Sequence, residues 1–204
     1  MKKINPVPFS EACERNQAPI LAVLADVFSG VRQVLEIGSG TGQHAVFLAT
    51  HLPHVVWQPT DLAECLPGLQ ARLVLEAPGN VRDALPLDVT DHPWSDALTG
   101  GGIDAVFSAN TLHIMSWHAV MSFFEHLGEV AAGACRLCIY GPFRYDDAFT
   151  TPSNARFDQW LKARDSRSGV RDFEAVDALA RTQGFRLVAD HAMPANNQML
   201  VWGK

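Results

Sequence analysis

Residues 34–44 read VLEIGSGTGQH, an apolar run that breaks into glycine at every second position. Val34, Leu35 and Ile37 are typical of a buried strand, in which aliphatic side chains pack well. Gly38, Gly40 and Gly42 are typical of a loop whose backbone approaches a ligand closely, because glycine has no Cβ. The stretch therefore predicts a strand followed by a binding loop, and the rest of the chain must indicate the ligand.

Length and composition favour one folded globular domain. A chain of 204 residues with 48% apolar and 19% charged residues is long enough for a three-layer core. The net charge of −6 disfavours nucleic acid and anionic membrane as partners, since both attract clustered Lys and Arg. The two lysines near the N-terminus precede no apolar stretch, and no apolar run reaches the roughly eighteen residues of a membrane span. We therefore expect a cytoplasmic protein.

The cysteine and histidine spacings do not predict a metal site. Cys135 and Cys138 form a C-x-x-C, but they lie in a strand-like segment, where residues three apart point to opposite faces. Buried, reduced thiols are the simpler interpretation. His51 and His54 straddle a proline in a predicted loop, without a second ligand pair nearby.

Strand-like and helix-like segments alternate over the first two thirds of the chain. The strand-like segments are residues 34–38, 55–60, 84–89, 103–109 and 136–141, and the helix-like segments are residues 43–52, 62–75, a short stretch near 94, and 117–130. Continuous apolar strands that alternate with helices indicate a parallel sheet covered on both faces.

The last third departs from this alternation. Residues 143–172 are too long and polar for a simple connection, and we interpret them as a lid-like insertion that contains a helix with Phe157, Trp160, Leu161 and Arg164 on one side. A further helix runs from about residue 172 to Gly184. Two final strands are separated by only three residues, which requires an antiparallel pair.

The predicted fold is a single α/β domain spanning residues 1–204, a Rossmann-like three-layer sandwich. Its seven-stranded sheet is mostly parallel with an antiparallel last strand, and a helix over about residues 10–28 precedes the first strand.

The glycine loop fits the dinucleotide fingerprint G-x-G-x-x-G imperfectly. The position of the third glycine holds Gln43, and the glycine falls one residue early, at Gly42. Glu36, two residues before the first glycine, would repel a pyrophosphate but suits a cationic ligand. A nicotinamide-dependent oxidoreductase is therefore the less favoured alternative.

The pattern E-x-G-x-G-x-G after a first strand resembles motif I of the class I S-adenosylmethionine (SAM)-dependent methyltransferases. Asp61 ends the second strand-like segment, where this resemblance implies an acid that accepts hydrogen bonds from the ribose hydroxyls. Asp88 ends the third, where the resemblance implies contact with the adenine amino group, and Val89 would line the base. The antiparallel last strand also matches the family. The resemblance thus implies SAM as the cofactor.

The cofactor residues implied by the resemblance are Glu36, Gly38, Ser39, Gly40, Thr41, Gly42, His44, Asp61, Leu62, Asp88, Val89 and Asn110. The flanking stretches SEACERNQAPIL and SNARFDQWLKARDSRSGVRDFEAV resemble the methyltransferase-like protein twenty-six family and its bacterial relatives. That resemblance implies the SAM fold and a transferase activity, without a known substrate.

The stretch SANTLHIMSW, residues 108–117, follows the fourth strand and is where acceptor chemistry is expected. It lacks the Asn/Asp-Pro-Pro-Tyr pattern of amide and DNA-amino methyltransferases, which disfavours those substrates. Asn110 and His113 are its candidate catalytic groups. His113, with an ordinary pKa near neutrality, is a candidate general base. Two alternatives stay open for it: a structural histidine, or a contact to the methionine part of the cofactor.

Polar residues around the lid-like insertion and in the first helix are candidate substrate contacts. They are Arg15, Asn16, Tyr140, Tyr145, Asn154 and Arg171. The basic members favour a small anionic or carboxylate-bearing substrate, and the alternative is an ordinary solvated surface. The sequence thus predicts a SAM-dependent methyltransferase acting on a small molecule. The alternative from another class is a SAM-binding protein without catalysis, which binds a partner or regulates. The acceptor atom and oligomeric state are not assigned.

Overall fold

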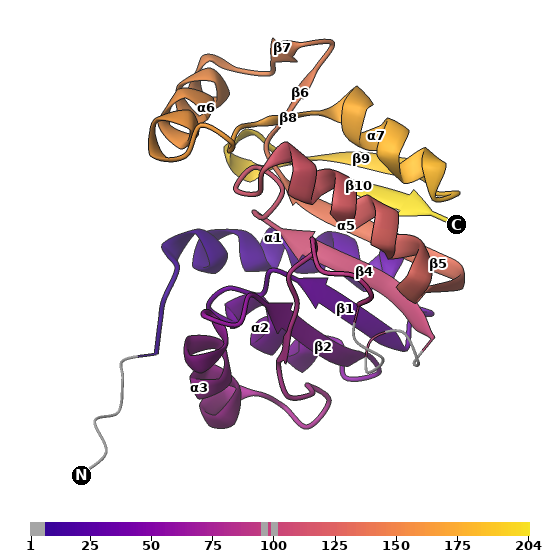
Figure 1. Cartoon of the computed structure of the whole chain (residues 1–204). Coiled ribbons are helices and arrows are strands. Elements are labelled where there is room, and N and C mark those ends of the chain that lie inside the picture. Colours follow the sequence, from indigo (N-terminus) through magenta and orange to yellow (C-terminus); the bar gives the residue numbers. More distant parts are fainter. Residues whose placement is uncertain (1–6, 95–97, 99–101) are drawn as a thin grey trace. The chain divides into compact units, whose positions relative to one another are not determined.

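The computed structural model describes residues 7–94, 98 and 102–204 of the chain (Figure 1). The chain forms two compact units, of which the first is Met1–Asp88 and the second is Val89–Lys204. Most of the helix that the sequence predicts near Trp94 falls on residues 95–97 and 99–101, outside the described part of the chain.

Three parallel strands form the sheet of the first unit, in the order β3-β2-β1. Their bounds are Gln33–Ile37 for β1, Val56–Asp61 for β2 and Leu85–Pro86 for β3. In the register of the sheet, Leu35 lies opposite Gln58 and Thr60 lies opposite Leu85. Four of the five residues of β1 are buried: the apolar Val34, Leu35 and Ile37, as predicted, and the acid Glu36.

Three helices accompany these strands: α1 (Glu11–Val27), α2 (Gln43–His51) and α3 (Leu66–Glu76). Ser10 caps α1, because its hydroxyl accepts a hydrogen bond from the backbone N–H of Cys13. The helix α3 begins four residues later than predicted. The N–H of Leu62 donates to the Asp61 carboxylate and the N–H of Cys65 donates to the carbonyl of Leu62, so residues 62–65 form a turn.

The second unit contains four longer strands in the order β4-β5-β10-β9. Their bounds are Ile103–Ala109 for β4, Ala131–Gly141 for β5, Arg186–Met193 for β9 and Asn197–Gly203 for β10. β4 and β5 are parallel, and β10 is antiparallel to both of its neighbours. β5 begins five residues before its predicted start because Ala131 pairs with Ile103 and because Cys135 exchanges two backbone hydrogen bonds with Lys204.

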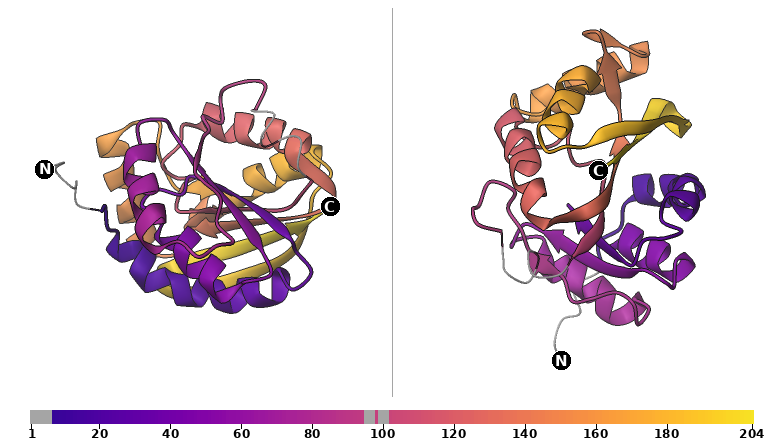
Figure 2. Two further views of the ribbon diagram at one scale, coloured as in Figure 1. Left: turned by 90° about the horizontal axis from the view of Figure 1, so that it is seen from below. Right: turned by 90° about the vertical axis from the view of Figure 1, so that its right-hand side faces the viewer.

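Two helices of the second unit, α5 (Trp117–Val130) and α7 (Phe173–Thr182), lie side by side along its strands (Figures 1 and 2). Ser116 caps α5 and Asp172 caps α7 through their side-chain oxygens. The indole N–H of Trp202 donates to the Asp177 carboxylate at 2.9 Å, and both side chains are buried. This bond fixes α7 on β10.

Residues 143–172 are more ordered than a plain polar lid. They form β6 (Phe143–Tyr145), β7 (Ala148–Phe149), α6 (Pro152–Arg164) and β8 (Arg171–Asp172), and the three strands make a small sheet in the order β7-β6-β8.

Phe157, Trp160 and Arg164 contact one another on one side of α6, as predicted, but most of this side is not buried. Trp160 is 51% exposed and stacks between Phe157 and Arg164 on the surface, while the buried residues are Asn154, Asp158 and Leu161.

The predicted fold class is confirmed. The two units supply the seven strands of a mostly parallel sheet whose last strand is antiparallel, and helices alternate with the strands. Among the described residues, no helix is both long and apolar enough to cross a membrane. Cys135 and Cys138 are buried, and burial raises the pKa of the Cys135 thiol to about 12.

Candidate cofactor site and substrate cavity

The glycine loop follows β1 directly and adopts left-handed backbone at three positions. The φ angles are 76° at Gly38, 55° at Gly40 and 77° at Gly42, a region in which residues with a Cβ are strained. The backbone N–H groups of Gly38 and Ser39 both donate to the carbonyl of Thr60. The loop is therefore bound to the end of β2, where Asp61 lies.

The Asp61 carboxylate is held by the glycine loop itself. The backbone N–H of Gly40 donates to Oδ2 at 2.5 Å, and that of Leu62 donates to Oδ1 at 2.8 Å. The residue is 9% exposed. A carboxylate can accept about four hydrogen bonds. Two backbone N–H groups therefore do not saturate the Asp61 carboxylate, which can accept further hydrogen bonds from a ligand.

Glu36 is a buried acid beneath the same loop. Its Oε2 accepts hydrogen bonds from the Ser39 hydroxyl and the Trp57 indole, each at 2.9 Å, and the residue is 1% exposed. Burial raises its pKa to about 7, and the nearby charge of Asp61 adds to that effect. A cation close to Glu36 would favour its ionised form, so the site suits a positively charged ligand.

Gln43, which replaces the third glycine of the dinucleotide fingerprint, ties the loop to the first helix. Its side-chain carbonyl accepts from the N–H of Ser10 at 2.6 Å and from the Thr41 hydroxyl at 2.9 Å. Its amide donates to the carbonyl of Ser10. A glycine at this position would make none of these contacts.

Sequence reasoning missed Arg72, a 7% exposed residue of α3. Its guanidinium donates to the carbonyls of Thr41 and Pro8 at 2.7 Å and pairs with Glu76. A lone arginine in a helical pattern carries no signal of such a role, because the contacts come from distant segments.

The predicted residues of α1 divide between buried and exposed positions. Asn16 is buried, and its side-chain carbonyl lies 2.7 Å from Nε2 of His44. Burial lowers the pKa of His44 to about 4, so the neutral ring donates this hydrogen bond. Arg15 is exposed and pairs with Glu11. The structure thus gives Asn16 a packing partner and places Arg15 in solvent.

The remaining predicted cofactor residues lie at or after strand ends. Leu62 is 38% exposed. Asp88 is half-buried two residues beyond β3, and Val89, the first residue of the second unit, is buried.

A cavity of about 380 Å³ lies in the second unit. Its lining residues are Asn110, His113, Pro142, Ser153, Asn154, Phe157, Ala195, Asn196 and Asn197. Three of the predicted site residues, Asn110, His113 and Asn154, are therefore brought together, although they come from separate segments of the chain.

Backbone strain gathers at this cavity. Asn110, Ala195 and Asn196 have φ angles of 58°, 59° and 58°. Left-handed backbone costs a residue with a Cβ roughly 1–2 kcal/mol, and such strain is concentrated at functional sites. The strain at Ala195 is notable because alanine lacks the local hydrogen bonds with which asparagine offsets it.

His113 lies in the cavity wall with its ring edge against Phe157, at a centroid distance of 5.4 Å. It is 5% exposed, and burial together with the charge of Arg171 lowers its pKa to about 4. The expectation of a pKa near neutrality is therefore wrong. Within the described part of the chain, neither ring nitrogen is hydrogen-bonded, so the neutral imidazole can bond to a molecule in the cavity.

Arg171 is engaged by the main chain instead of lining the cavity. Its guanidinium donates to the carbonyls of Leu112 at 3.0 Å, Met115, and Arg167 at 3.0 Å. Arg171 therefore positions the loop that carries His113.

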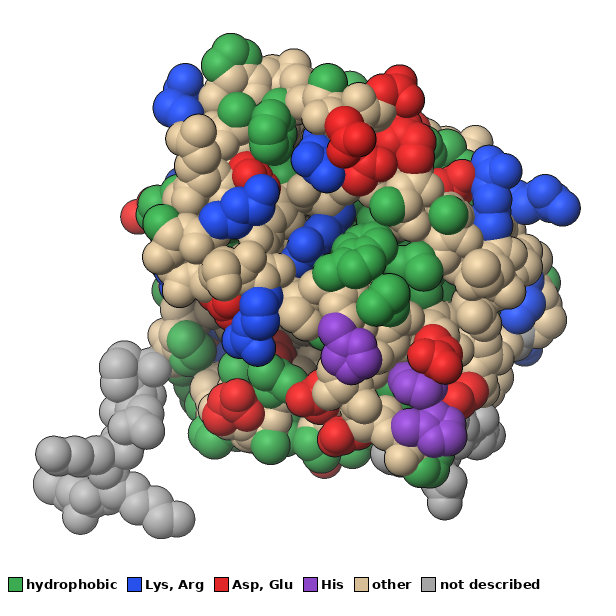
Figure 3. Space-filling view, turned by 45° about the horizontal axis from the view of Figure 1, so that its top comes forward, with side chains coloured by type: hydrophobic (Ala, Val, Ile, Leu, Met, Phe, Trp, Pro, Cys, Tyr) green, Lys and Arg blue, Asp and Glu red, His purple; other side chains and the backbone are tan. Residues whose placement is uncertain are grey.

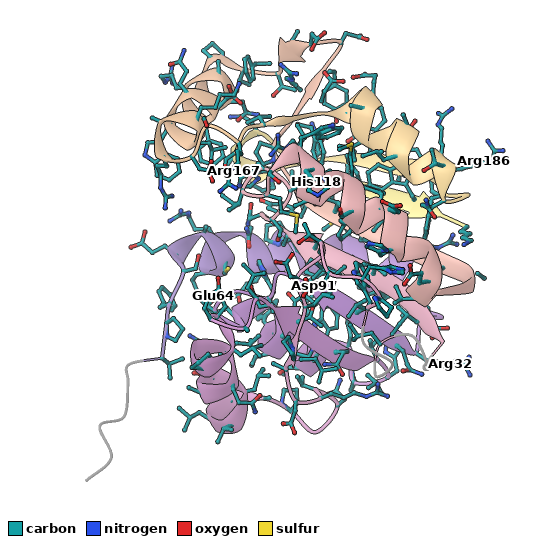
Figure 4. The ribbon with its side chains drawn as sticks, in the orientation of Figure 1. Arg32, Glu64, Asp91, His118, Arg167 and Arg186 are labelled. Carbon is teal, nitrogen blue, oxygen red and sulfur yellow. The ribbon has the colours of Figure 1, made fainter. Side chains whose placement is uncertain are left out.

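The turn around Arg167, labelled in Figure 4, adds two further bonds to this loop. The Ser168 hydroxyl donates to the carbonyl of Ile114 at 2.7 Å, and the N–H of Gly169 donates to the carbonyl of His113 at 2.9 Å.

The two predicted tyrosines are also outside the cavity lining. Tyr140 is 2% exposed within β5, and the hydroxyl of Tyr145 donates to the Asp190 carboxylate at 2.7 Å. Asn154, in contrast, lines the cavity and donates to the carbonyl of Asn196 at 2.9 Å. This bond joins α6 to the connection between β9 and β10.

Solved structures of methyltransferases share this fold. An O-methyltransferase family protein from Burkholderia thailandensis is 17% identical with a TM-score of 0.79, and the match covers 95% of this chain and 57% of that chain. The SAM-dependent methyltransferase SibL, in its apo form, is 21% identical with a TM-score of 0.75, covering 94% and 55%. Human N-acetylserotonin methyltransferase in complex with SAM is 16% identical with a TM-score of 0.75, covering 95% and 53%.

At these identities the likeness shows the fold alone, and the chain spans little more than half the length of these proteins. A family model matches residues 7–204, nearly the whole chain. The chain belongs to DUF938, a family of proteins of unknown function.

Proposed function

We propose that this protein is a SAM-dependent methyltransferase that acts on a small molecule. The observation that carries the proposal is the Asp61 carboxylate, held at the end of β2 by the backbone of a loop with three left-handed glycines. The methyltransferase fold of the structural neighbours, one of them in complex with SAM, supports it.

The residues of the first unit fit this cofactor in shape and charge. A Cβ added at Gly40 would have no neighbour within 4 Å, so the loop presents open space at the point where a ligand would approach. We infer that Asp61 holds the ribose hydroxyls, that Glu36 favours the cationic part, and that Asp88 contacts the adenine. SAM, when bound, supplies an activated methyl group. The protein's own contribution is to orient the reactants, an effect worth about 7–11 kcal/mol.

The cavity of the second unit supports an uncharged acceptor. Its lining, within the described residues, consists of amides, a hydroxyl, an imidazole, an aromatic ring and small apolar groups, without Lys, Arg, Asp or Glu. A carboxylate-bearing substrate would need Arg171, whose guanidinium is bonded to three carbonyls. We therefore infer a small polar molecule that is held by amide hydrogen bonds and packs on Phe157.

One observation favours the alternative of binding without catalysis. A general base works best when its pKa lies near the working pH, and the pKa of His113 is about 4. His113 is thus a weak proton acceptor, better suited to orienting a hydroxyl or amine than to deprotonating it. An acceptor that loses its proton only after methyl transfer needs no stronger base.

Calorimetry with SAM and with its demethylated product tests the cofactor assignment. Asp61→Ala should weaken binding tenfold or more, because each hydrogen bond to a charged acceptor contributes about 1.5–3 kcal/mol. Asp26→Ala, which removes an exposed acid of α1, is the matched control and should bind like the wild type. Unchanged affinity in a folded Asp61→Ala protein would contradict the proposal, and binding of NADH by the wild type would favour the oxidoreductase.

A further inference from the structure

We propose that His92, His126 and Glu129 form a binding site for a zinc-class divalent metal ion. The three side chains lie in the second unit, outside the cavity described above. Their ligand atoms all lie within 4.8 Å of one another. The inference does not depend on methyl transfer.

The fold brings the three residues together from two segments. His126 and Glu129 are three residues apart near the end of α5, so they share one face of the helix. His92 comes from the segment before β4. Sequence reasoning missed the site because the only local signal is the pair on α5, and the third ligand is 34 residues away.

The two imidazoles converge on one carboxylate oxygen. Nε2 of His92 lies 3.1 Å and Nδ1 of His126 lies 3.0 Å from Oε1 of Glu129. In a tetrahedral zinc site with bonds of about 2.0 Å, ligand atoms are about 3.3 Å apart. The two separations from Glu129 are close to this value, and all three ligand atoms lie within 4.8 Å of one another, so side-chain rotations would admit the ion.

The surroundings are those of a half-open metal site. His126 is 8% exposed, and its ring packs near Trp94, which is 1% exposed, at a centroid distance of 5.9 Å. The side chain of His92 is 60% exposed and that of Glu129 is 34% exposed. One histidine is thus fixed against an apolar wall, while solvent can reach the site and supply a water as fourth ligand.

The charge of the ligand set suits a dication. Two neutral imidazoles and one carboxylate carry a single negative charge, and imidazole nitrogen with carboxylate oxygen is a combination that zinc prefers. Acidic and histidine side chains gather on one part of the face drawn in Figure 3. The competing explanation is a hydrogen-bonded cluster in which both imidazoles donate to Glu129 and no ion binds.

Zinc titration of the protein, stripped of metal with a chelator, distinguishes the two explanations. Calorimetry should show one equivalent of Zn²⁺ bound with micromolar or tighter affinity. At a free concentration of a hundred times the dissociation constant, Zn²⁺ should raise the melting temperature by roughly 5–10 °C. Cobalt in the same site should give visible bands without the near-ultraviolet band of a thiolate ligand, which separates it from the free cysteines.

His92→Ala is the main variant because the side chain is mostly exposed, so its loss should leave the fold intact. It should weaken zinc binding at least tenfold and, at the same free Zn²⁺ concentration, reduce the thermal shift to about half or less. Glu129→Gln should do the same while keeping the shape of the side chain. The matched control is His118→Ala, an exposed histidine in the first turn of α5 (labelled in Figure 4), which should bind zinc like the wild type. Wild-type protein that binds no zinc in the micromolar range would overturn the proposal, as would unchanged affinity in His92→Ala.

Discussion

Glu36 combines two demands that oppose each other. As a buried acid it is costly to ionise, whereas the proposed role beside a cationic ligand requires the ionised form. Burial raises the pKa of Glu36 from 4.5 to about 7. Between these two pH values the unfolded chain has released the proton of this carboxyl, whereas the folded protein still holds it. Stability from this residue is therefore highest at acidic pH and is lost as the pH rises to about 7.

We predict that Glu36→Gln stabilises the free protein more at high pH than at low pH. Its side-chain carbonyl still accepts from Ser39 and Trp57, so the gain in the free energy of unfolding should be about 3 kcal/mol at pH 8 and about 1 kcal/mol at pH 5. Chemical denaturation at the two pH values measures it. Glu14→Gln, at an exposed position of α1, should change neither value. A loss of stability that is equal at both pH values would contradict the assignment.

His113 predicts a pH dependence of the opposite sign. Its folded-state pKa, about 4, lies below the ordinary 6.5, so the unfolded chain binds a proton first as the pH falls through 6.5 toward 4. Acidification from pH 7 to 5 should then cost about 2 kcal/mol through this residue. In His113→Gln, the loss of unfolding free energy between pH 7 and pH 5 should be about 2 kcal/mol smaller than in the wild type. In His118→Ala it should equal that of the wild type. A His113 ring signal in NMR spectra that titrates near pH 6.5 would show that the ring is hydrated.

At the scale of the element, two glycines of the loop have different expected roles: Gly40 in ligand binding and Gly42 in packing and stability. Gly40 and Gly42 both have left-handed backbone, but a Cβ at Gly42 would lie 2.8 Å from Cδ1 of the buried Leu69, whereas a Cβ at Gly40 would meet nothing within 4 Å. Gly40 therefore faces open space, and Gly42 packs against α3.

Gly42→Ala should therefore destabilise the protein by roughly 2–4 kcal/mol, from backbone strain and overpacking together. Gly40→Ala should cost only the strain, roughly 1–2 kcal/mol. It should nevertheless weaken SAM binding more strongly, since its methyl group occupies the space for the ligand. Thermal denaturation and calorimetry on the two variants measure both effects. Equal stability losses, or SAM affinity retained in Gly40→Ala, would show that the loop does not approach a ligand.

The helix α6 shows an element whose buried face is polar. Asn154 and Asp158 are buried, and Asp158 accepts a hydrogen bond from the N–H of Val170 at 2.9 Å and pairs with Lys162. Apolar periodicity alone therefore indicated the helix but did not show which of its residues are buried. The bonds that orient α6 come from residues that follow it in the chain.

At the scale of the whole molecule, we expect uneven protection of backbone amides. Residues 143–171 have few buried apolar side chains and should exchange hydrogen faster than β4 and β5, which pair without interruption from Ala105 and Arg136 to Ala109 and Tyr140. Val170 should be the slow exception, because its N–H is bonded to the buried Asp158. Hydrogen exchange measured by mass spectrometry or NMR tests this pattern. Protection of the entire segment equal to that of β5 would show that it is core structure.

The sequence determined the order and type of the main elements. The strands at residues 34–37 and 103–109 and the helix at 117–130 were predictable because their apolar residues repeat with one clear period and their ends carry local signals, such as Gly38 and Ser116. The glycine loop and Asp61 were predictable for the same reason, since the positions and spacing of these residues at strand ends are local facts.

Only the tertiary structure decided what depends on contacts between distant segments. Burial lowers the pKa of His113 and raises that of Glu36. The residues next to them in the sequence do not predict how deeply either side chain is buried. The charge of Arg171 suggested a substrate contact, but its guanidinium donates to backbone carbonyls of Leu112 and Met115, in the loop that contains His113. His92 meets Glu129 only because the chain brings the segment before β4 against α5. Periodicity identifies elements, whereas packing places one side chain beside another, and the chemistry of a site follows from that placement.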